Sequence, residues 1–250
     1  MVDVDRLLLA IDTSTEQVGL ALYDGAWLSE LSWRAGRNQT ASLLGQIDHL
    51  LRLNQLEVRQ IKAIGVTLGP GSFNGLRVGM SVAKGLSYGL GLPLVGVVTL
   101  DVLAYPHTVR RYPIRAFVRV GRGRVIYADY HCRGGQWVRE SLLRTVGADQ
   151  LAEGLTEPTV LAGELDHQLA ERLRGQPRVL LPPPSWRLLR PGWVAEVALE
   201  RWTAGAADPV ELLEPIYVHL GTAEVGVPVQ LRKGANQSFM MARDDWVEGE

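Results

Sequence analysis

The spacing of apolar residues predicts a set of strands at the start of the chain. Leu7 to Ile11 is a continuous apolar stretch, and residues 17–23 and 27–33 alternate between apolar and polar side chains. The dipeptide Asp24-Gly25 between the two alternating stretches is typical of a hairpin turn. The pattern therefore predicts three consecutive antiparallel strands.

A helix, a buried strand and a glycine-rich loop are predicted next. Apolar residues along 40–53 have the spacing of one face of an amphipathic helix. An apolar run at 61–68 predicts a buried strand, and the loop 69–75 leads into a second helix over 76–90. A further strand is predicted at 94–98.

The second half of the chain repeats this order of elements. The predictions are strands at 114–120, 125–132 and 137–143, a helix at 148–154, a strand at 158–163, a helix at 165–174, a strand at 178–181 and a helix at 192–204. The repeat predicts an α/β fold of two ribonuclease-H-like domains. We place the first domain at residues 1–106, the smaller second domain at 107–220 and a flexible tail at 221–250.

The composition is that of a soluble globular protein. The 250 residues include 26 Lys and Arg against 27 Asp and Glu, and 46% are hydrophobic. The single cysteine, Cys132, excludes a disulfide framework and a multi-thiolate metal site. No apolar run approaches the roughly 20 residues of a membrane span, and the N-terminus lacks the pattern of a signal peptide. We therefore expect a cytoplasmic protein without membrane contact.

Basic residues are unevenly distributed. Nine arginines and two acids lie between Pro106 and Arg144, whereas residues 145–170 contain five acids and no Lys or Arg. An arginine-rich face can bind a polyanion through bidentate contacts with phosphate. Arginine is also the general basic residue of this chain, which has three lysines, so a composition bias explains much of the uneven distribution.

The first candidate site is the segment Asp12-Thr13-Ser14-Thr15, directly after the first predicted strand. Hydroxyls and backbone N–H groups in such a turn can bind a phosphate, and a carboxylate at a strand end can hold hydrated Mg²⁺. Asp and Thr in a turn also bond their own backbone, which requires no ligand. The motif leaves both interpretations open.

The second candidate site is the loop 69–77, whose glycines allow a close approach to a ligand. The following helix would direct unpaired N–H groups at an anion. The loop lacks the lysine of a Walker loop, and Ser72 does not stand in a nucleophile elbow. We therefore predict a non-catalytic anion or adenylate pocket, with a ligand-free tight turn as the alternative. The predicted pocket residues are Asp12, Thr13, Ser14, Gly69, Gly71 and Ser72.

The helix after this loop carries two strips of small residues. Gly75, Gly79 and Ala83 form one strip, and Ser81, Gly85 and Gly89 form the other. Glycine inside a helix costs about 1 kcal/mol relative to alanine, so close packing of another backbone is expected in compensation. The partner is either the sheet of the same chain or a helix of another molecule.

Catalytic and metal-binding residues are not predicted. The five histidines lack the spacing of a metal motif, and no activated nucleophile is recognisable. We therefore expect neither a metal centre nor a catalytic residue in this chain.

Three segments resemble a known family. The sequences of 9–15, of 69–79 and of 83–86 resemble the TsaB family of bacterial tRNA threonylcarbamoyladenosine biosynthesis proteins. The similarity covers about residues 7–105, and Glu214-Pro215-Ile216-Tyr217-Val218 is similar to the segment that closes the family's sequences. Arg119 and Arg124 stand where the family usually has acidic residues.

The resemblance implies an actin/Hsp70/sugar-kinase-like fold with two ribonuclease-H-like domains and a non-catalytic role. TsaB proteins act as partners of the metal-containing TsaD, with TsaE, in threonylcarbamoyl transfer to the adenosine beside the tRNA anticodon. It also implies a homodimer when TsaD is absent, contact with tRNA through the complex, no required cofactor, and an adenine nucleotide at the complex interface. The two N-terminal helices would form the partner contact, through Leu43, Ile47, Leu50, Gly75, Gly79, Val82, Ala83 and Leu86.

Other functions stay open at this point. One alternative is an enzyme, either an ATP-dependent phosphotransferase that uses Asp12 and the glycine loop or a glycoprotease-related peptidase. Another is direct tRNA binding by the arginine-rich second domain.

Overall fold

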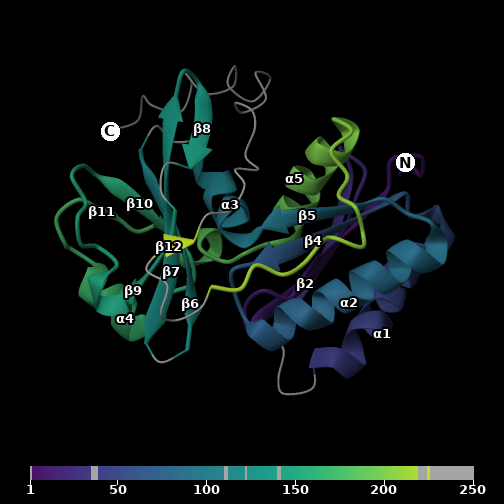
Figure 1. Cartoon of the computed structure of the whole chain (residues 1–250), viewed down its shortest axis with the longest axis horizontal. Coiled ribbons are helices and arrows are strands. Elements are labelled where there is room, and N and C mark those ends of the chain that lie inside the picture. Colours follow the sequence, from purple (N-terminus) through teal and green to yellow (C-terminus); the bar gives the residue numbers. More distant parts are fainter. Residues whose placement is uncertain are drawn as a thin grey trace.

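The computed structural model describes residues 2–34, 39–109, 112–121, 123–139, 142–218 and 224–225. Within these ranges, the side chains of residues 39–42 and 224–225 are not described. The fold has two lobes, each built on one mixed sheet (Figure 1).

The first sheet has the strand order β3-β2-β1-β4-β5. Its strands are β1 (Leu8–Asp12), β2 (Gln17–Tyr23), β3 (Leu28–Arg34), β4 (Ala63–Gly69) and β5 (Leu94–Val98). The first three pair antiparallel, as predicted, while β4 and β5 run parallel to β1. The hairpin between β2 and β3 turns at Gly25, which has a φ of 104°. Asp24 Oδ1 accepts hydrogen bonds from the backbone N–H groups of Ala26 and Trp27.

Helices cover both faces of the first sheet, which explains the unbroken apolar run of β1. Helices α1 (Gln39–Leu53) and α2 (Phe73–Leu90) lie on one face, where they form a buried cluster with Leu9 and Ile11. Helix α5 (Pro191–Thr203) lies on the other, against Leu8 and Ala10 (Figure 1). Alternate residues of one strand therefore enter two different cores.

The second sheet repeats the topology of the first. Its path is β11-β10-β6-β7-β9-β12, with β8 paired to β7. The strands are β6 (Ile114–Val120), β7 (Arg124–Arg133), β8 (Gln136–Arg139), β9 (Leu143–Gly147), β10 (Thr159–Ala162), β11 (Val179–Leu180) and β12 (Glu224–Val225). Strands β9-β7-β6-β10-β11 occupy the places of β3-β2-β1-β4-β5, and the predicted repeat is confirmed.

The remaining helices are short. They are α3 (Thr99–Ala104), α4 (His167–Leu173) and the 3-10 turns η1 (Val58–Gln60), η2 (Tyr105–His107), η3 (Ala148–Gln150) and η4 (Pro184–Trp186). The sequence pattern missed α3 because all six of its residues are buried and show no polar face. The predicted strand 137–143 is divided between β8 and β9, and the predicted helix 148–154 is the short turn η3.

Two helices pack against the sheet of the other lobe. Helix α5 lies within the predicted second domain (107–220) but packs against every strand of the first sheet. Helix α3 follows the last strand of the first sheet but packs mainly against β6 of the second. Because α3, α5 and residues of both sheets share one buried cluster, the lobes have a continuous core.

The helix α3 is also joined to the second sheet by a buried ion pair. Asp101 Oδ1 accepts hydrogen bonds from the Tyr130 hydroxyl at 2.6 Å and from Arg139 Nη1 at 3.2 Å. The side chains of Asp101 and Arg139 are 1% and 3% exposed. This pair fixes the segment that connects the lobes.

The predicted tail lies almost entirely outside the described residues. Within it, β12 pairs antiparallel with β9 through Glu224 and Val225. In the part of the chain that the structure describes, no helix is long and apolar enough to cross a membrane.

Candidate functional site

The two motifs singled out from the sequence meet at the carboxyl ends of β1 and β4. The Ser72 N–H donates to the Ser14 carbonyl at 2.7 Å. A Cβ at Gly71 would lie 2.1 Å from the same carbonyl oxygen, and one at Gly75 would lie 2.0 Å from the Thr13 oxygen. The glycines are therefore needed for close packing between the turn after β1 and the start of α2.

The Thr13 side chain fills the first small-residue strip of α2. Its hydroxyl donates to the Gly75 carbonyl at 2.7 Å, and a Cβ at Gly79 would lie 2.2 Å from the same hydroxyl oxygen. This strip therefore packs within the chain, which is one of the two partners that the sequence left open.

Asp12 lies at the centre of this junction and is fully buried. Its Oδ1 accepts hydrogen bonds from the Ser14 N–H at 3.0 Å, the Ser14 hydroxyl at 2.7 Å and the Thr67 hydroxyl at 2.8 Å. Burial raises the pKa of the Asp12 carboxyl, and these hydrogen bonds oppose the shift. Asp12 Oδ2 has no hydrogen-bond partner among the described residues. Thr67 was not among the predicted site residues, although its hydroxyl in the otherwise apolar strand β4 was a usable signal.

A cleft of about 960 Å³ lies between the lobes beside this junction. Ser14, Gly71 and Ser72 line it from the first lobe, while Asp12, Thr13 and Gly69 are not among the lining residues. The second lobe contributes the turn between β6 and β7 and the loop after β10. The structure thus brings the six predicted pocket residues together, but exposes half of them to the cleft.

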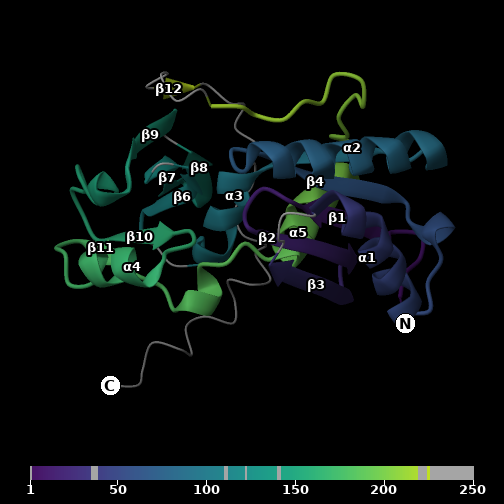
Figure 2. The same ribbon diagram turned by 90° about the horizontal axis from the view of Figure 1, so that it is seen from below.

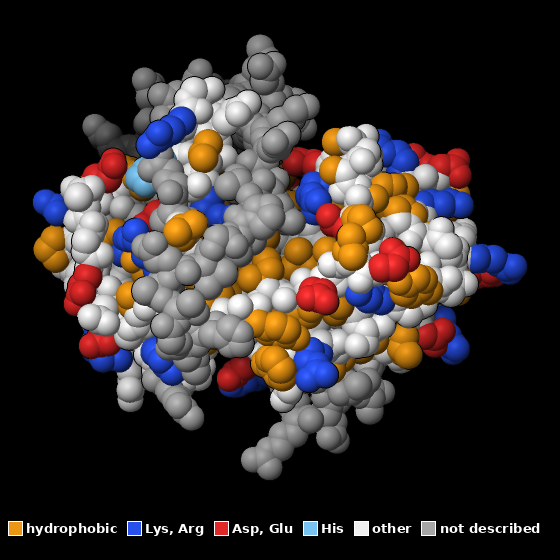
Figure 3. Space-filling view, viewed as in Figure 1, with side chains coloured by type: hydrophobic (Ala, Val, Ile, Leu, Met, Phe, Trp, Pro, Cys, Tyr) orange, Lys and Arg blue, Asp and Glu red, His pale blue; other side chains and the backbone are white. Residues whose placement is uncertain are grey.

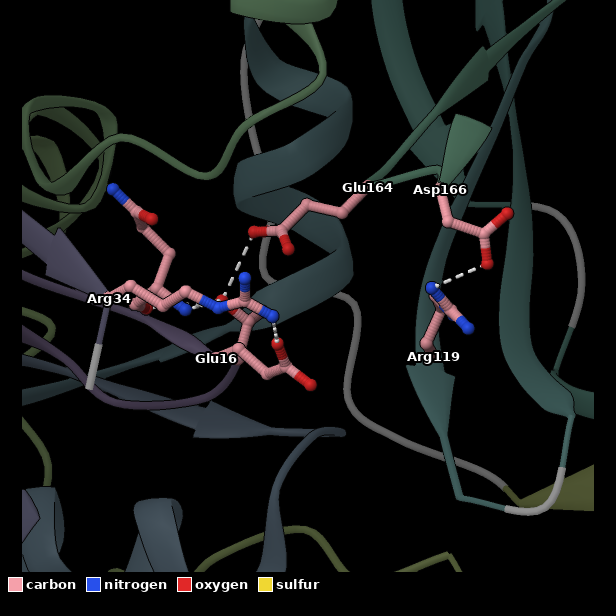
Figure 4. A network of polar contacts seen from close by, with 7 residues as sticks. Glu16, Arg34, Arg119, Glu164 and Asp166 are labelled. Carbon is pink, nitrogen blue, oxygen red and sulfur yellow. Dashed lines mark hydrogen bonds and ion pairs between the residues drawn. The ribbon is translucent and has the colours of Figure 1, made fainter. Parts of the chain in front are cut away.

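Four of the charged residues that line the cleft form two ion pairs (Figure 4). Arg34 pairs with Glu16 at 2.6 Å, and Arg119 pairs with Asp166 at 3.0 Å. Glu164 Oε1 lies 3.2 Å from the Thr15 hydroxyl, a hydrogen bond that joins the two lobes. Burial and then the nearby Asp12 and Glu16 carboxylates raise the pKa of Glu164, against the hydrogen bond from Thr15. Neither Thr15 nor Glu164 was among the predicted site residues.

Two hydroxyls of the predicted anion pocket already form hydrogen bonds within the protein. The Ser14 hydroxyl donates to Asp12, and Ser72 Oγ accepts the Gly75 N–H as the cap of α2. Glu16 and Glu164 place carboxylates in the same cleft. The arrangement favours the ligand-free interpretation of the turn over tight binding of a phosphate. Within the described residues, no group of three His, Cys, Asp or Glu side chains is placed to hold a metal ion.

Glu164 in the cleft is expected to make the stability of the folded chain depend on pH. A carboxyl with a raised pKa binds its proton more tightly in the folded chain, so its contribution to stability is lost as the pH rises above the unfolded value of 4.5 through the folded pKa. The Glu164→Gln variant keeps an acceptor for Thr15 without this ionisation. We expect it to gain stability relative to the wild type between pH 4.5 and neutral pH, measured by urea unfolding.

A matched control for this experiment is Glu157→Gln, which changes an exposed glutamate. Its stability relative to the wild type is expected to stay constant over the same pH range. A constant difference for Glu164→Gln as well would contradict the raised pKa of Glu164.

Six of the eight residues predicted for the partner contact are buried within this chain. Leu43, Ile47, Leu50 and Ala83 are buried in the core between α1, α2 and the first sheet, and Gly75 and Gly79 pack against Thr13. Val82 and Leu86 are half-buried against the same core. Periodicity identified the apolar face of each helix correctly, but that face contacts the sheet of its own chain.

A different face of α2 is exposed. The residues Phe73, Arg77, Ser81, Gly85 and Tyr88 all lie on the surface, and we call them the α2 stripe. Phe73 and Tyr88 are 54% and 59% exposed, and a Cβ at Gly85 would meet nothing within 4 Å. The second small-residue strip, Ser81, Gly85 and Gly89, therefore faces outward.

Residues 208–218 form a strap that lies along α2 (Figure 2). Asp208 anchors one end through Arg201 and the Gly96 N–H, and the Ile216 N–H donates to the Leu68 carbonyl at 2.7 Å near the other. The strap adds Leu212, which is 78% exposed, and Tyr217, whose ring lies 4.9 Å from that of Phe73. Figure 3 shows hydrophobic side chains gathered over this part of the surface.

The arginines of the second lobe are partly used inside the protein. Arg115 makes a buried ion pair with Asp129 at 2.7 Å, and Arg139 pairs with Asp101. Arg119 pairs with Asp166 in the cleft. These pairs account for three of the nine arginines in the basic segment, so its composition overstates the free positive charge.

Comparison with known proteins places the chain in a family. A family model described as "TsaD: tRNA N6-adenosine threonylcarbamoyltransferase" matches residues 33–164, more than half of the chain. The tRNA threonylcarbamoyladenosine biosynthesis protein TsaB of Bacillus subtilis is 32% identical over 230 residues, which cover 87% of this chain and 96% of that protein. The chain belongs to the TsaB family. The resemblance seen in the sequence is thereby confirmed.

Other TsaB relatives agree over most of their length. TsaB of Escherichia coli is 27% identical over 241 residues, which cover 88% of this chain and 98% of that protein. The solved structure of YeaZ from Pseudomonas aeruginosa has a TM-score of 0.70 at 24% identity and covers 85% of this chain and 99% of that one. The predicted α/β fold with two mixed sheets is confirmed for this TsaB-family chain.

Proposed function

We propose that this TsaB-family chain acts in threonylcarbamoyladenosine biosynthesis on tRNA as a non-catalytic partner of TsaD. Its curated relatives in E. coli and B. subtilis are named for that biosynthesis. The family model that it matches is named for the transferase TsaD, so the chain and that enzyme share a common unit. A chain related to a transferase is suited to pair with it, because related units can present similar surfaces to each other.

The observation that carries this proposal is the exposed apolar surface made by the α2 stripe and the strap. Phe73, Tyr88 and Leu212 are each more than half exposed there. Exposed aromatic and apolar side chains beside a flat, small-residue strip are typical of a protein interface. The stripe replaces the inward-facing residues predicted from the sequence as the proposed contact with TsaD.

The condition of Asp12 supports a non-catalytic role. A catalytic carboxylate must reach substrate or a metal ion. Asp12 is fully buried, and its Oδ1 already accepts three hydrogen bonds from Ser14 and Thr67. We propose that this carboxylate organises the junction between β1, β4 and α2.

The rest of the assembly follows from the same proposal. TsaE joins the complex, tRNA is contacted through the complex, and the chain forms a homodimer through the same stripe when TsaD is absent. The chain needs no resident cofactor and works in the cytoplasm. An adenine nucleotide at the complex interface stays a prediction.

Gly85→Trp is expected to weaken the complex with TsaD from the same organism strongly. The added side chain would project from the α2 stripe into the partner, while a Cβ at this position meets nothing within 4 Å in the chain itself. Loss of a central contact of about 2 kcal/mol raises Kd roughly 30-fold. Size-exclusion chromatography with light scattering would show the loss, and circular dichroism would show that the monomer stays folded.

The matched control is Gln168→Trp, which places the same bulky side chain on the exposed face of α4 in the other lobe. It should leave the complex intact. Complexes of equal affinity for Gly85→Trp and Gln168→Trp would refute the α2 stripe as the contact. ATP or peptide turnover by the purified chain, lost in Asp12→Ala, would instead favour the phosphotransferase or peptidase alternative.

A further inference from the structure

The strap forms one side of the cleft between the lobes. Its residues Ile216, Tyr217 and Val218 line the cleft together with residues of both lobes. The strap runs along α2 and then toward β12, which pairs with the second sheet (Figures 1 and 2). The side chains of Ile216 and Val218 pack against the buried cluster that the lobes share. The cleft is therefore bounded by a third segment in addition to the two lobes.

Regular backbone hydrogen bonding contributes little to the position of this part of the strap. Residues 213–218 belong to neither a helix nor a strand. The Ile216 N–H donates to the Leu68 carbonyl at 2.7 Å, while the Asp208 N–H donates to the Leu94 carbonyl eight residues earlier. Segments with few regular hydrogen bonds open locally at a low cost in free energy. Side-chain contacts therefore matter for keeping residues 216–218 in place.

The ring of Tyr217 provides such a contact with α2. Its centroid lies 4.9 Å from that of Phe73, with an angle of 40° between the ring planes. Phe73 is the first residue of α2, directly after the capping residue Ser72. The guanidinium carbon of Arg77 lies 5.4 Å from the centre of the Phe73 ring. Since the start of the helix and Arg77 hold Phe73, the ring pair attaches the strap to a well-ordered element.

The ring pair lies at the surface, whereas the apolar wall of the cleft is buried. Phe73 and Tyr217 both line the cleft, and they are 54% and 38% exposed. Leu103, Val118 and Ile126 also line the cleft, but each is at most 3% exposed. The two rings can therefore separate without disturbing a buried core. They are placed to control entry to the apolar part of the cleft.

We propose that Phe73 and Tyr217 form a clasp, which holds the strap against the cleft and limits the access of solutes to its apolar wall. When the rings separate, the strap moves away from the start of α2 and the wall becomes accessible. Phe73 also belongs to the α2 stripe, so the clasp lies where the exposed surface of α2 meets the cleft. The clasp operates in the free chain and requires no partner on the stripe.

The rate of thiol labelling in the full chain measures access to the wall. The background is Cys132→Ser, which removes the exposed native thiol, and the probe is Val118→Cys. Loss of the ring contact is expected to raise the open population about fivefold. We therefore expect Tyr217→Ala and Phe73→Ala each to speed labelling of the probe by this factor, and both together to have no larger effect than either one. Tyr217→Phe keeps the ring and should label as slowly as the background.

A second probe separates opening of the cleft from general loosening of the fold. Val125→Cys replaces a fully buried valine of β7 that does not line the cleft, and Tyr217→Ala should leave its labelling unchanged. Tyr112→Ala removes an exposed tyrosine outside the cleft lining and should affect neither probe. Equal acceleration at both probes would show a loosened fold and overturn the clasp. Unchanged labelling of Val118→Cys, or independent effects of the two ring variants, would overturn it as well.

Discussion

Alanine in place of Gly75 is expected to lower the free energy of unfolding by about 3 kcal/mol. Its Cβ would lie 2.0 Å from the Thr13 carbonyl oxygen, a backbone atom that cannot move without disturbing β1. Gly85→Ala in the same helix is expected to raise the free energy of unfolding by about 1 kcal/mol, because nothing lies within 4 Å of its Cβ and alanine favours a helix. Urea unfolding followed by circular dichroism measures both.

The opposite signs of these two changes test how α2 is oriented. If Gly75→Ala were as stable as Gly85→Ala, the junction between the Asp12 turn and α2 would not be packed as described. The packing of α2 against Thr13 also decides which variants can test the proposed TsaD contact. A bulky residue at Gly79 would collide with Thr13, so loss of the complex there would report damage to the fold instead of the contact.

Asp101→Ala is expected to lower the free energy of unfolding by about 4 kcal/mol, because it leaves the buried cation of Arg139 without its carboxylate. The Tyr130 hydroxyl loses its acceptor at the same time. Thermal and urea unfolding of the full chain measure the effect. The control Asp48→Ala breaks an exposed ion pair with Arg52 on α1 and should leave the stability nearly unchanged.

A paired replacement shows whether the loss comes from an uncompensated charge. Asp101→Leu combined with Arg139→Met removes both charges, and we expect it to be clearly more stable than Asp101→Ala alone. If the double variant is less stable than the single one, the loss in Asp101→Ala does not come from the uncompensated charge on Arg139.

Local sequence patterns determined most of the elements and the repeated order of strands in this protein. The apolar run of β1, the alternation in β2 and the Asp24-Gly25 turn are short-range features that follow from steric and solvation rules. The motifs at 9–15 and 69–79 likewise identified the family. These features need no knowledge of distant contacts.

The sequence alone did not determine which surface of α2 is free. Gly75, Gly79 and Ala83 and the outward Ser81, Gly85 and Gly89 form equivalent patterns along the chain. The orientation is decided by Thr13, which lies 62 residues before Gly75 and fills the first strip. A helical pattern shows that small residues share a face, but not whether that face meets the same chain or another molecule.

Tertiary structure also decided the lobe that each helix joins and the partners of the charged groups. Helix α5 returns to the first sheet, and Glu164 reaches Thr15 across 149 residues of sequence. Asp12 Oδ1 accepts hydrogen bonds from the hydroxyls of Ser14 and Thr67, which lie 2 and 55 residues away in the sequence. Pairings of this kind depend on how sheets and connectors pack in three dimensions, so short-range patterns do not encode them individually. The family and the fold could therefore be predicted from the sequence. The exposed surface of α2 and the hydrogen bonds in and beside the cleft, in contrast, depend on tertiary packing.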